Sequence, residues 1–353
     1  MNSKLSRNFG SDNVTPVCPP IMAAINAANS GMLPSYGADE FTERLQRAAS
    51  TVFEREVAVY PVATGTAANA LALAQLAPPF GGIYCHSGAH IVTDECGAPE
   101  LYTGGAKLLG LPSPDGKIGP RAIEASVALA NDMGVHHVKP SAISVTQATE
   151  LGTVYGLDEI AALGAVAKRH GLGVHMDGAR FANALVHLGC TPAEATWKAG
   201  VDVLSFGASK NGALAAEAVV FFDPHRAENF DRRRKQAGHL WSKLRYLSCQ
   251  LLAYLQDDLW LRNALQANAM AARLAQGLER VAGARLLQRV QANELFAAVP
   301  EKLIAGLEGE DFHFYRWPWL EVEEGAAAIR LVTSYATREE DVDDFVRSAE
   351  RLS

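Results

Sequence analysis

Asp177 and Lys210 are the two side chains whose types and spacing first suggest chemistry. Each follows a short apolar segment, residues 172–176 before the aspartate and residues 201–206 before the lysine. Such segments are expected to be buried strands, and an open α/β sheet binds ligands at the edge where its parallel strands end. We therefore expect Asp177 and Lys210 to share one crevice.

An aspartate and a lysine in one crevice suit pyridoxal phosphate. A lysine amine forms a Schiff base with the aldehyde of this cofactor, and a carboxylate keeps its pyridine nitrogen protonated so that the ring can accept electrons. Taken singly, Asp177 could be a helix N-cap and Lys210 a surface lysine. The pair, together with the motifs that follow, favours the cofactor.

Residues 63–69 (ATGTAAN) predict an anion site. They follow a predicted strand at 57–62 and open an apolar helix. A turn of small residues entering a helix leaves backbone N–H groups free, and the helix dipole adds positive potential. Thr64 and Thr66 could add hydroxyl donors. The alternative is an ordinary strand-to-helix turn; the segment matches neither a Walker loop nor a dinucleotide fingerprint.

Two further polar residues are expected at the same edge. His90 follows a predicted strand at 83–86 and could stack on a flat ring or transfer protons near neutral pH, with a structural histidine as the alternative. Glu150 follows a predicted buried strand at 142–146.

Two arginines are candidates for binding a carboxylate. Arg180 comes three residues after Asp177 and could make a paired contact with a carboxylate or phosphate, or form a surface salt bridge. Arg330 stands in an otherwise apolar predicted strand at 328–334, where a charge is costly without a partner. That partner could be a structural carboxylate or the carboxylate of a substrate.

The elements that must position these residues predict an α/β protein. Predicted strands alternate with helices up to about residue 222, which implies a mainly parallel sheet with right-handed crossovers, flanked by helices. Short strands near 294–299, 312–319 and 328–334, with a final helix at 338–352, indicate a smaller α+β domain. We divide the chain into an N-terminal arm at 1–18, a large α/β domain at 19–248 and a small C-terminal domain at 249–353.

Composition narrows the classes of partner. The 353 residues are 48% hydrophobic and 20% charged, as in ordinary globular proteins of about two domains. The net charge of −7 gives no basic footprint for nucleic acid or an anionic membrane. No signal-peptide pattern, apolar run of about 18 residues, or paired cysteine spacing is present. We expect a cytoplasmic protein without a metal that acts on a small molecule.

These motifs together resemble the fold-type I pyridoxal phosphate enzymes, a transferase-like fold, and within them the low-specificity L-threonine aldolases of the β-eliminating lyase family. The resemblance covers nearly the whole chain, and its two most specific segments contain Asp177 and Lys210. The matching segments are Ser11-Asp12-Asn13, Ser35-Tyr36-Gly37, Thr64-Gly65-Thr66 with Asn69, Ala89-His90 with Glu95, residues 175–180 (HMDGAR) and Ser209-Lys210.

The resemblance implies roles for the matched residues. Lys210 would hold the cofactor as a Schiff base, Asp177 would pair with the pyridinium nitrogen, and His90 would stack on the ring. Cofactor contacts are implied for Thr64, Gly65, Thr66, His90, Asp177, Arg180, Ser209 and Lys210. Substrate contacts are implied for Ser11, Tyr36, Arg180 and Arg330.

The chain departs from the family pattern at Ala148-Thr149-Glu150, where many members carry Asn-Thr-His. A histidine proposed to handle protons is replaced there, so the base for the substrate hydroxyl is left open between Glu150, His90 and a bound water. The resemblance also implies sites at a dimer interface, commonly within a homotetramer. A phosphate contact from another subunit is therefore expected, with Lys243 as a candidate.

The reaction that the resemblance implies is retro-aldol cleavage of L-threonine, L-allo-threonine and related β-hydroxy-α-amino acids to glycine and an aldehyde. The alternatives are a β-eliminating lyase, an aminotransferase or a cysteine desulfurase of the same fold, which would release pyruvate, a keto acid or sulfur. No loop with a candidate persulfide cysteine follows Lys210, which disfavours the desulfurase. A non-catalytic pyridoxal-binding domain is disfavoured because the lysine and the carboxylate-binding arginines are both present.

Overall fold

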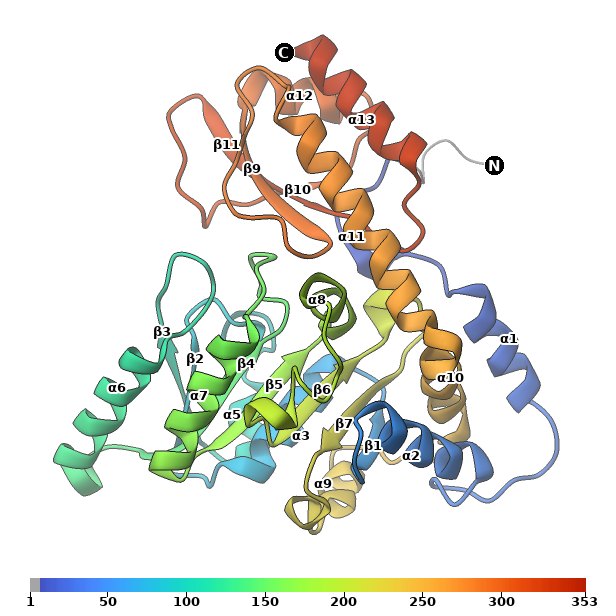
Figure 1. Ribbon diagram of the computed structural model, residues 1–353, viewed down its shortest axis with the longest axis vertical. Coiled ribbons are helices and arrows are strands. Elements are labelled where there is room, and N and C mark those ends of the chain that lie inside the picture. The colour runs from blue at the N-terminus through green and yellow to red at the C-terminus, as the bar shows by residue number, and fades with distance from the viewer. Residues whose placement is uncertain (1–6) are drawn as a thin grey trace.

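The computed structural model describes residues 7–353 and consists of a large lower part and a smaller upper part (Figure 1). A seven-stranded sheet forms the middle of the large part, and a four-stranded antiparallel sheet lies in the small part. The predicted fold class, a mainly parallel α/β sheet flanked by helices with a smaller C-terminal α+β region, is confirmed. None of the helices in residues 7–353 has the length and apolar character that crossing a membrane requires.

The large sheet has the strand order β1-β7-β6-β5-β4-β2-β3. Its strands are β1 (Ala58–Val62), β2 (Gly81–His86), β3 (Lys107–Leu111), β4 (Lys139–Thr146), β5 (Gly173–Gly178), β6 (Val203–Gly207) and β7 (Glu217–Phe221). Within residues 7–353, β7 alone runs antiparallel to its neighbours in this sheet. β7 therefore begins at the edge of the sheet where the other six strands end.

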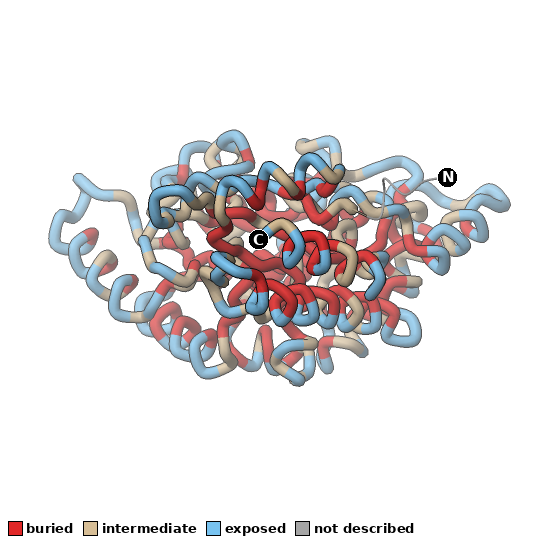
Figure 2. Tube along the Cα trace, turned by 90° about the horizontal axis from the view of Figure 1, so that it is seen from above, coloured by how far each residue is buried: buried red, intermediate tan, exposed pale blue. Residues whose placement is uncertain are grey.

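Helices cover both faces of this sheet, and buried residues fill the space between the layers (Figure 2). One layer contains α2 (Glu40–Val52), α6 (Pro120–Met133), α7 (Leu157–His170), α8 (Phe181–Leu188) and α10 (Arg245–Leu255). The other contains α3 (Gly65–Leu76), α4 (His90–Thr93), α5 (Ala98–Thr103) and α9 (Phe230–Gln236). Alternate residues of a strand pack against different layers. On β6, Leu204 and Phe206 face the first layer, and Val203 faces α3.

Helix α3 brings its N-terminus close to the edge of the sheet. It contains five alanines and is buried over most of its length, from Ala67 to Ala74. A helix without a polar face has to lie inside the protein, and small side chains let its backbone approach the strands closely. The turn before Gly65 is thereby placed beside the carboxyl ends of β5 and β6.

The small sheet has the order β10-β11-β9-β8. Its strands are β8 (Arg285–Leu286), β9 (Glu294–Pro300), β10 (Tyr315–Arg316) and β11 (Ala326–Val332), packed with α11 (Leu259–Leu278), α12 (Glu301–Gly309) and α13 (Glu339–Leu352). The predicted strand at 312–319 is wrong in extent, since only two of its residues form β10. Pro318 follows closely, and a proline cannot donate a ladder hydrogen bond.

Helix α11 joins the two hydrophobic cores (Figure 1). Its first turns, with Trp260 and Ala264, pack in the core of the large part, whereas Met270 and Leu274 pack in the core of the small part. Helix α10 packs against α2 and against α1 (Pro19–Ala28). The domain boundary after residue 248 stays a prediction, and this packing places the change of core within α11.

The N-terminal arm was predicted at 1–18, of which residues 1–6 lie outside the described residues. Phe9 is tied to the small part: its N–H donates to the carbonyl of His313 (2.7 Å), and its own carbonyl accepts from the N–H of Val332 (2.8 Å). The chain then continues through a short 3-10 turn, Asp12–Val14, to the large sheet. The arm therefore connects both parts of the molecule.

Gly164 offers a test of the packing between α7 and the 3-10 turn Trp197–Ala199. A Cβ at Gly164 would overlap with the backbone carbonyl oxygen of Ala199, which cannot rotate away. We expect Gly164→Ala to lower the free energy of unfolding by about 1–3 kcal/mol, as overpacking does in cores. Chemical denaturation would measure this loss. The control is Gly309→Ala, where an added Cβ meets nothing within 4 Å; an equal effect in both variants would contradict the packing argument.

Candidate active site

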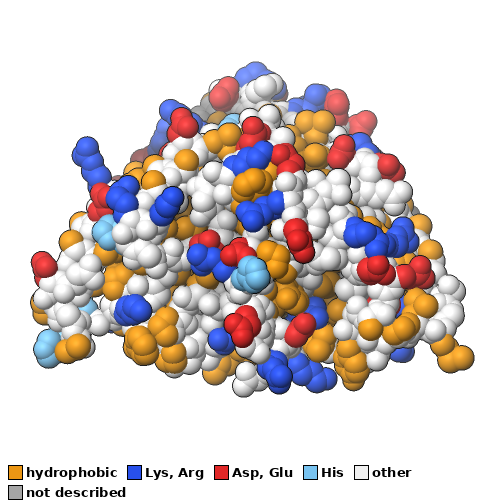
Figure 3. Space-filling model, turned by 60° about the horizontal axis from the view of Figure 1, so that its bottom comes forward, with side chains coloured by type: hydrophobic (Ala, Val, Ile, Leu, Met, Phe, Trp, Pro, Cys, Tyr) orange, Lys and Arg blue, Asp and Glu red, His pale blue; other side chains and the backbone are white. Residues whose placement is uncertain are grey.

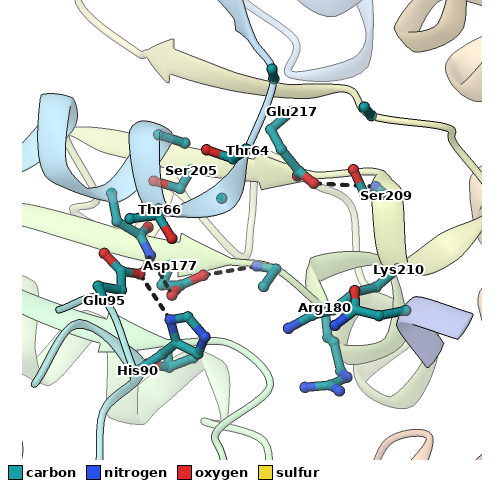
Figure 4. A pocket seen from close by; sticks show the side chains of 18 of the residues that line it. Thr64, Thr66, His90, Glu95, Asp177, Arg180, Ser205, Ser209, Lys210 and Glu217 are labelled. Atoms are coloured by element: carbon teal, nitrogen blue, oxygen red, sulfur yellow. Dashed lines mark hydrogen bonds and ion pairs between the residues drawn. The ribbon is translucent and has the colours of Figure 1, made fainter. Parts of the chain in front are cut away.

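A cavity of about 340 Å³ lies at the carboxyl ends of β4, β5 and β6, beside the N-terminus of α3 (Figure 4). It brings together nine of the predicted site residues: Thr64, Gly65, Thr66, His90, Glu150, Asp177, Arg180, Ser209 and Lys210. Ser11, Tyr36 and Arg330 are not part of its lining.

Asp177 and Lys210 reach this cavity from adjacent strands. Asp177 lies near the end of β5 and is 3% exposed; its Oδ1 accepts from the N–H of Ala179 (2.9 Å) and its Oδ2 from Nδ2 of Asn69 (2.8 Å). Lys210 follows β6 in the short turn Ser209–Asn211. Within residues 7–353, no cationic side chain forms an ion pair with Asp177, so its carboxylate can accept a cationic group of a ligand.

Asn69 links Asp177 to a second carboxylate. Its Nδ2 also donates to Oε1 of Glu95 (2.8 Å), and the same Oε1 accepts from Nδ1 of His90 (2.9 Å). The hydrogen bond to Glu95 raises the pKa of His90 and outweighs burial, which acts in the opposite direction. Burial raises the pKa of Glu95. His90 is thereby held in a fixed orientation and is able to carry a proton near neutral pH.

Glu150 also faces the cavity. Its Oε1 accepts from the backbone N–H of His90 (2.8 Å) and from the hydroxyl of Thr146 (2.9 Å). Its Oε2 is buried and has no hydrogen-bond partner within residues 7–353. Burial, together with the nearby charge of Asp177, raises the pKa of Glu150 to about 7. This carboxyl group can therefore exchange a proton in the physiological range.

The turn before α3 has the geometry of an anion site. Thr64 caps the helix, because its hydroxyl oxygen accepts from the N–H of Ala67 (3.2 Å). A Cβ on Gly65 would meet no atom within 4 Å, so the turn faces open space. Thr66 and, from the other side, Ser209 line the same end of the cavity. This end could hold a phosphate group while the end near Asp177 holds a ring nitrogen.

Arg180 is held by two carboxylates. Its Nε donates to Oδ2 of Asp12 (2.8 Å) and its Nη2 to Oδ1 of Asp12 (3.1 Å), and Nη2 lies 3.6 Å from Oε2 of Glu294. Burial would raise the pKa of Asp12, but the charges of Arg180 and Lys210 outweigh it and the pKa is lowered. Nη1 of Arg180 makes no hydrogen bond within residues 7–353, so one edge of the guanidinium is left for a ligand.

Arg330 lies on β11 with its guanidinium over two rings, 4.8 Å from the centroid of Trp317 and 5.5 Å from that of Tyr315. Its Nη2 donates to the carbonyl of Gly10 (3.2 Å), and its Nε is buried without a partner. Within residues 7–353 it pairs with no carboxylate. A structural carboxylate, the alternative partner for Arg330, is therefore not found in this part of the chain.

Ser11 and Tyr36 lie elsewhere. The hydroxyl of Ser11 accepts from the N–H of Asn13 (3.1 Å), and Asn13 itself lines the cavity. Tyr36 is 49% exposed, has a positive φ of 59° and carries Nζ of Lys235 4.6 Å from its ring centroid.

Several polar residues of the cavity had no role assigned from the sequence, among them Asn69, Glu95 and Glu217. Asn69 and Glu95 belong to the matching segments. Only the orientation of α3 in the structure shows that the amide of Asn69 contacts both Glu95 and Asp177. Glu217 begins β7, whereas the other predicted site residues follow the ends of strands. The signal that could have found it is a glutamate at the start of an apolar strand soon after Lys210.

The comparisons with known proteins all point to one family. The β-eliminating lyase family model matches residues 8–302. The chain is 42% identical to the low specificity L-threonine aldolase of Pseudomonas sp. (strain NCIMB 10558), over 96% of each chain, and 43% identical to that of Pseudomonas aeruginosa, over 97% and 96%. The structure of Leishmania major threonine aldolase superposes with a TM-score of 0.92 at 30% identity, covering 98% of this chain and 99% of that one. The chain belongs to the β-eliminating lyase family, whose enzymes, threonine aldolases among them, use pyridoxal phosphate.

Proposed function

We propose that this protein cleaves L-threonine, L-allo-threonine and related β-hydroxy-α-amino acids to glycine and an aldehyde. The observation that carries the proposal is the shared cavity of Asp177 and Lys210 beside the turn at Gly65, in a chain similar to low specificity L-threonine aldolases over nearly its whole length. The expected alternatives, a β-eliminating lyase or an aminotransferase, would use the same two residues and differ in product.

Different residues of the cavity would hold different parts of the cofactor. Lys210 would hold the aldehyde end of the cofactor through its amine, and Asp177 would pair with the ring nitrogen. Thr64, Gly65, Thr66 and Ser209 would bind the phosphate, and His90 would stack on the ring. When bound, pyridoxal phosphate supplies an electron sink for the electron pair left on Cα as a bond to Cα breaks.

The substrate carboxylate is assigned to Ser11, Arg180 and Arg330. Nη1 of Arg180 points to no acceptor in the described chain, and Arg330 contacts Gly10, the residue before Ser11. These contacts would hold the substrate in the orientation in which its Cα–Cβ bond breaks. Orientation of this kind can lower a barrier by as much as about 7–11 kcal/mol. Tyr36 is assigned to the substrate side chain.

A base must accept the β-hydroxyl proton while the Cα–Cβ bond breaks; the electron pair of the O–H bond then forms the aldehyde carbonyl, and Cα takes up a proton to give glycine. Glu150 is our first candidate because its Oε2 is unpartnered, with His90 and a bound water as the alternatives. His90 in turn is oriented by Glu95.

Glu150→Gln tests the first candidate. A glutamine keeps the oxygen that accepts from His90 and Thr146 but cannot accept the proton, so we expect kcat/KM to fall by roughly 10²- to 10⁴-fold. In the wild-type protein, activity should rise with pH through about 7, because Glu150 must be ionised to act as a base. The pH–rate profile measures both effects. Glu124→Gln, on the surface of α6, is the control; unchanged kinetics in Glu150→Gln would exclude Glu150 as the obligatory base.

We propose a homodimer or homotetramer with its sites at an interface, acting in the cytoplasm. Lys243 and Tyr36 support this: both are exposed and neither lines the cavity of its own chain, as residues that serve a neighbouring subunit require. Hydrophobic side chains reach the surface in several places on the face shown in Figure 3, among interspersed acidic and basic ones. Sedimentation and the effect of Lys243→Ala on cofactor affinity test the assembly.

The reaction is tested by incubating the purified holoenzyme with L-threonine and with L-allo-threonine. We expect equal amounts of acetaldehyde and glycine from at least one of them. Release of pyruvate or a keto acid without glycine would show that a β-eliminating lyase or an aminotransferase is the better assignment.

A further inference from the structure

Glu217 is a buried carboxylate at the anion end of the cavity, and nothing so far explains it. It is the first residue of β7, which pairs antiparallel with β1 and β6 so that Glu217 stands opposite Val62 and Gly207. Both turns proposed to hold phosphate follow those partners: residues 63–66 after β1 and residues 208–210 after β6. Figure 4 accordingly shows Glu217 between Thr64 and Ser209.

The carboxylate of Glu217 holds the turn that carries Lys210 in place. Its Oε2 accepts from the N–H of Ala208 (3.0 Å) and its Oε1 from the N–H of Ser209 (3.3 Å). The hydroxyl oxygen of Ser209 in turn accepts from the N–H of Ala216 (3.3 Å). Glu217 is 7% exposed, and within residues 7–353 no cationic side chain forms an ion pair with it. Its direct contacts in the described part of the chain are with N–H and O–H groups, and the charge of Lys210 acts on it from the adjoining turn.

An ionised Glu217 would repel a phosphate dianion bound at this end of the cavity. A phosphate ester is largely dianionic at pH 7, since its second pKa is about 6. Burial raises the pKa of Glu217 to about 7, against the opposing effect of its contacts with Ser209 and Ala208 and of the charge of Lys210. A dianion entering the same end of the cavity favours the neutral acid further, and a neutral acid can donate a hydrogen bond.

We propose that Glu217 is a positioning residue that makes phosphate binding proton-linked: it holds the Ala208–Ser209 turn in place, and it takes up a proton when the phosphate ester enters. This inference deepens the proposed cofactor site and rests on it. It does not depend on which amino acid is cleaved.

Of the other titratable groups that face Glu217, Tyr254 and His239 keep one charge state across the same range. Tyr254, on α10, has its pKa raised by burial and stays neutral. His239 accepts from the N–H of Ala63 (3.3 Å), and burial lowers its pKa, so it is neutral above pH 7. Lys210 contributes its positive charge from the adjoining turn. Among these groups, Glu217 is therefore the one expected to change its ionisation between pH 7 and 9. Glu150, whose pKa is also raised to about 7, contacts His90 and Thr146 instead, and the comparison with pyridoxine accounts for its effect.

The test uses apoprotein and pyridoxine 5′-phosphate, which has no aldehyde and so cannot react with Lys210. Dissociation constants are measured from pH 6.5 to 9, and pyridoxine without phosphate reports the contribution of the ring alone. For the wild-type protein we expect the phosphorylated ligand, relative to pyridoxine, to bind more weakly as pH rises above 7, by up to about tenfold per pH unit. For Glu217→Gln we expect this dependence to disappear, because glutamine cannot ionise.

Thr66→Ala is the matched control, because it removes a hydroxyl from the same end of the cavity without removing a titratable group. We expect weaker binding by the same factor at each pH, with the slope of the wild-type protein. A slope in Glu217→Gln equal to that of the wild-type protein would overturn the proposal.

A second measurement on the wild-type protein covers the case in which Glu217→Gln does not fold. Calorimetry at pH 8, in buffers of different ionisation enthalpy, counts the protons taken up on binding. We expect nearly one more proton with pyridoxine 5′-phosphate than with pyridoxine, and equal uptake would overturn the proposal. If phosphorylated and unphosphorylated ligands bind alike, the phosphate site itself is wrong, whereas aldehyde release from threonine tests the reaction separately.

Discussion

Replacing Lys210 by alanine is expected to reduce aldehyde release to background and to abolish the absorbance of the lysine-bound cofactor. The lysine lines the same cavity as Asp177, which is proposed to hold the other end of the ring, and alanine removes the amine on which both signals depend. Absorbance spectra of the reconstituted variant and an acetaldehyde assay with L-threonine measure the two effects.

Lys168→Ala, on the exposed end of α7, is the control for loss of a lysine and should keep both signals. Matching circular dichroism spectra would show that Lys210→Ala folds. Full turnover by folded Lys210→Ala would rule out the assignment of Lys210.

Asp177→Asn has the second largest expected effect. Asparagine has the same size and keeps an oxygen for the N–H of Ala179, but it cannot offset a positive charge on the pyridine nitrogen. Removing one member of a buried charge pair costs roughly 3–5 kcal/mol, which corresponds to about 10²- to 10⁴-fold in kcat/KM. Steady-state kinetics with L-threonine, and cofactor content after dialysis, measure the loss.

Asp202→Asn is the matched control for this variant. Asp202 accepts a hydrogen bond from the N–H of Val174 (2.8 Å) and does not line the cavity. It should therefore affect stability and leave the kinetics unchanged. Wild-type kinetics in Asp177→Asn would contradict the proposed contact with the pyridinium nitrogen.

The sequence was informative wherever a parallel strand ends. The apolar segments before Asp177 and Lys210 form β5 and β6, and these two strands are neighbours, so residues 33 positions apart in the chain meet in one cavity. Glu150 follows β4 by the same rule. The rule depends on strand direction, and it fails at Glu217 because β7 runs the other way.

Contacts between distant segments could not be predicted from the sequence. Nothing near Arg180 indicates that Asp12, 168 residues earlier, occupies two of its nitrogens. Arg330 was expected to need a partner, yet it lies over aromatic rings, a contact that depends on the pairing of β10 with β11. Such pairings follow from tertiary packing, which periodicity alone does not encode.

The two carboxylates on Arg180 limit how far the molecule can hinge. Arg180 follows β5 in the large part, whereas Glu294 begins β9 in the small part and Asp12 lies on the arm tied to β11. Swinging the two parts away from each other would break the contacts of a buried guanidinium with both acids. These contacts favour the arrangement in which the two parts stay together, so we expect amino acids to reach the cavity without a wide separation of the parts.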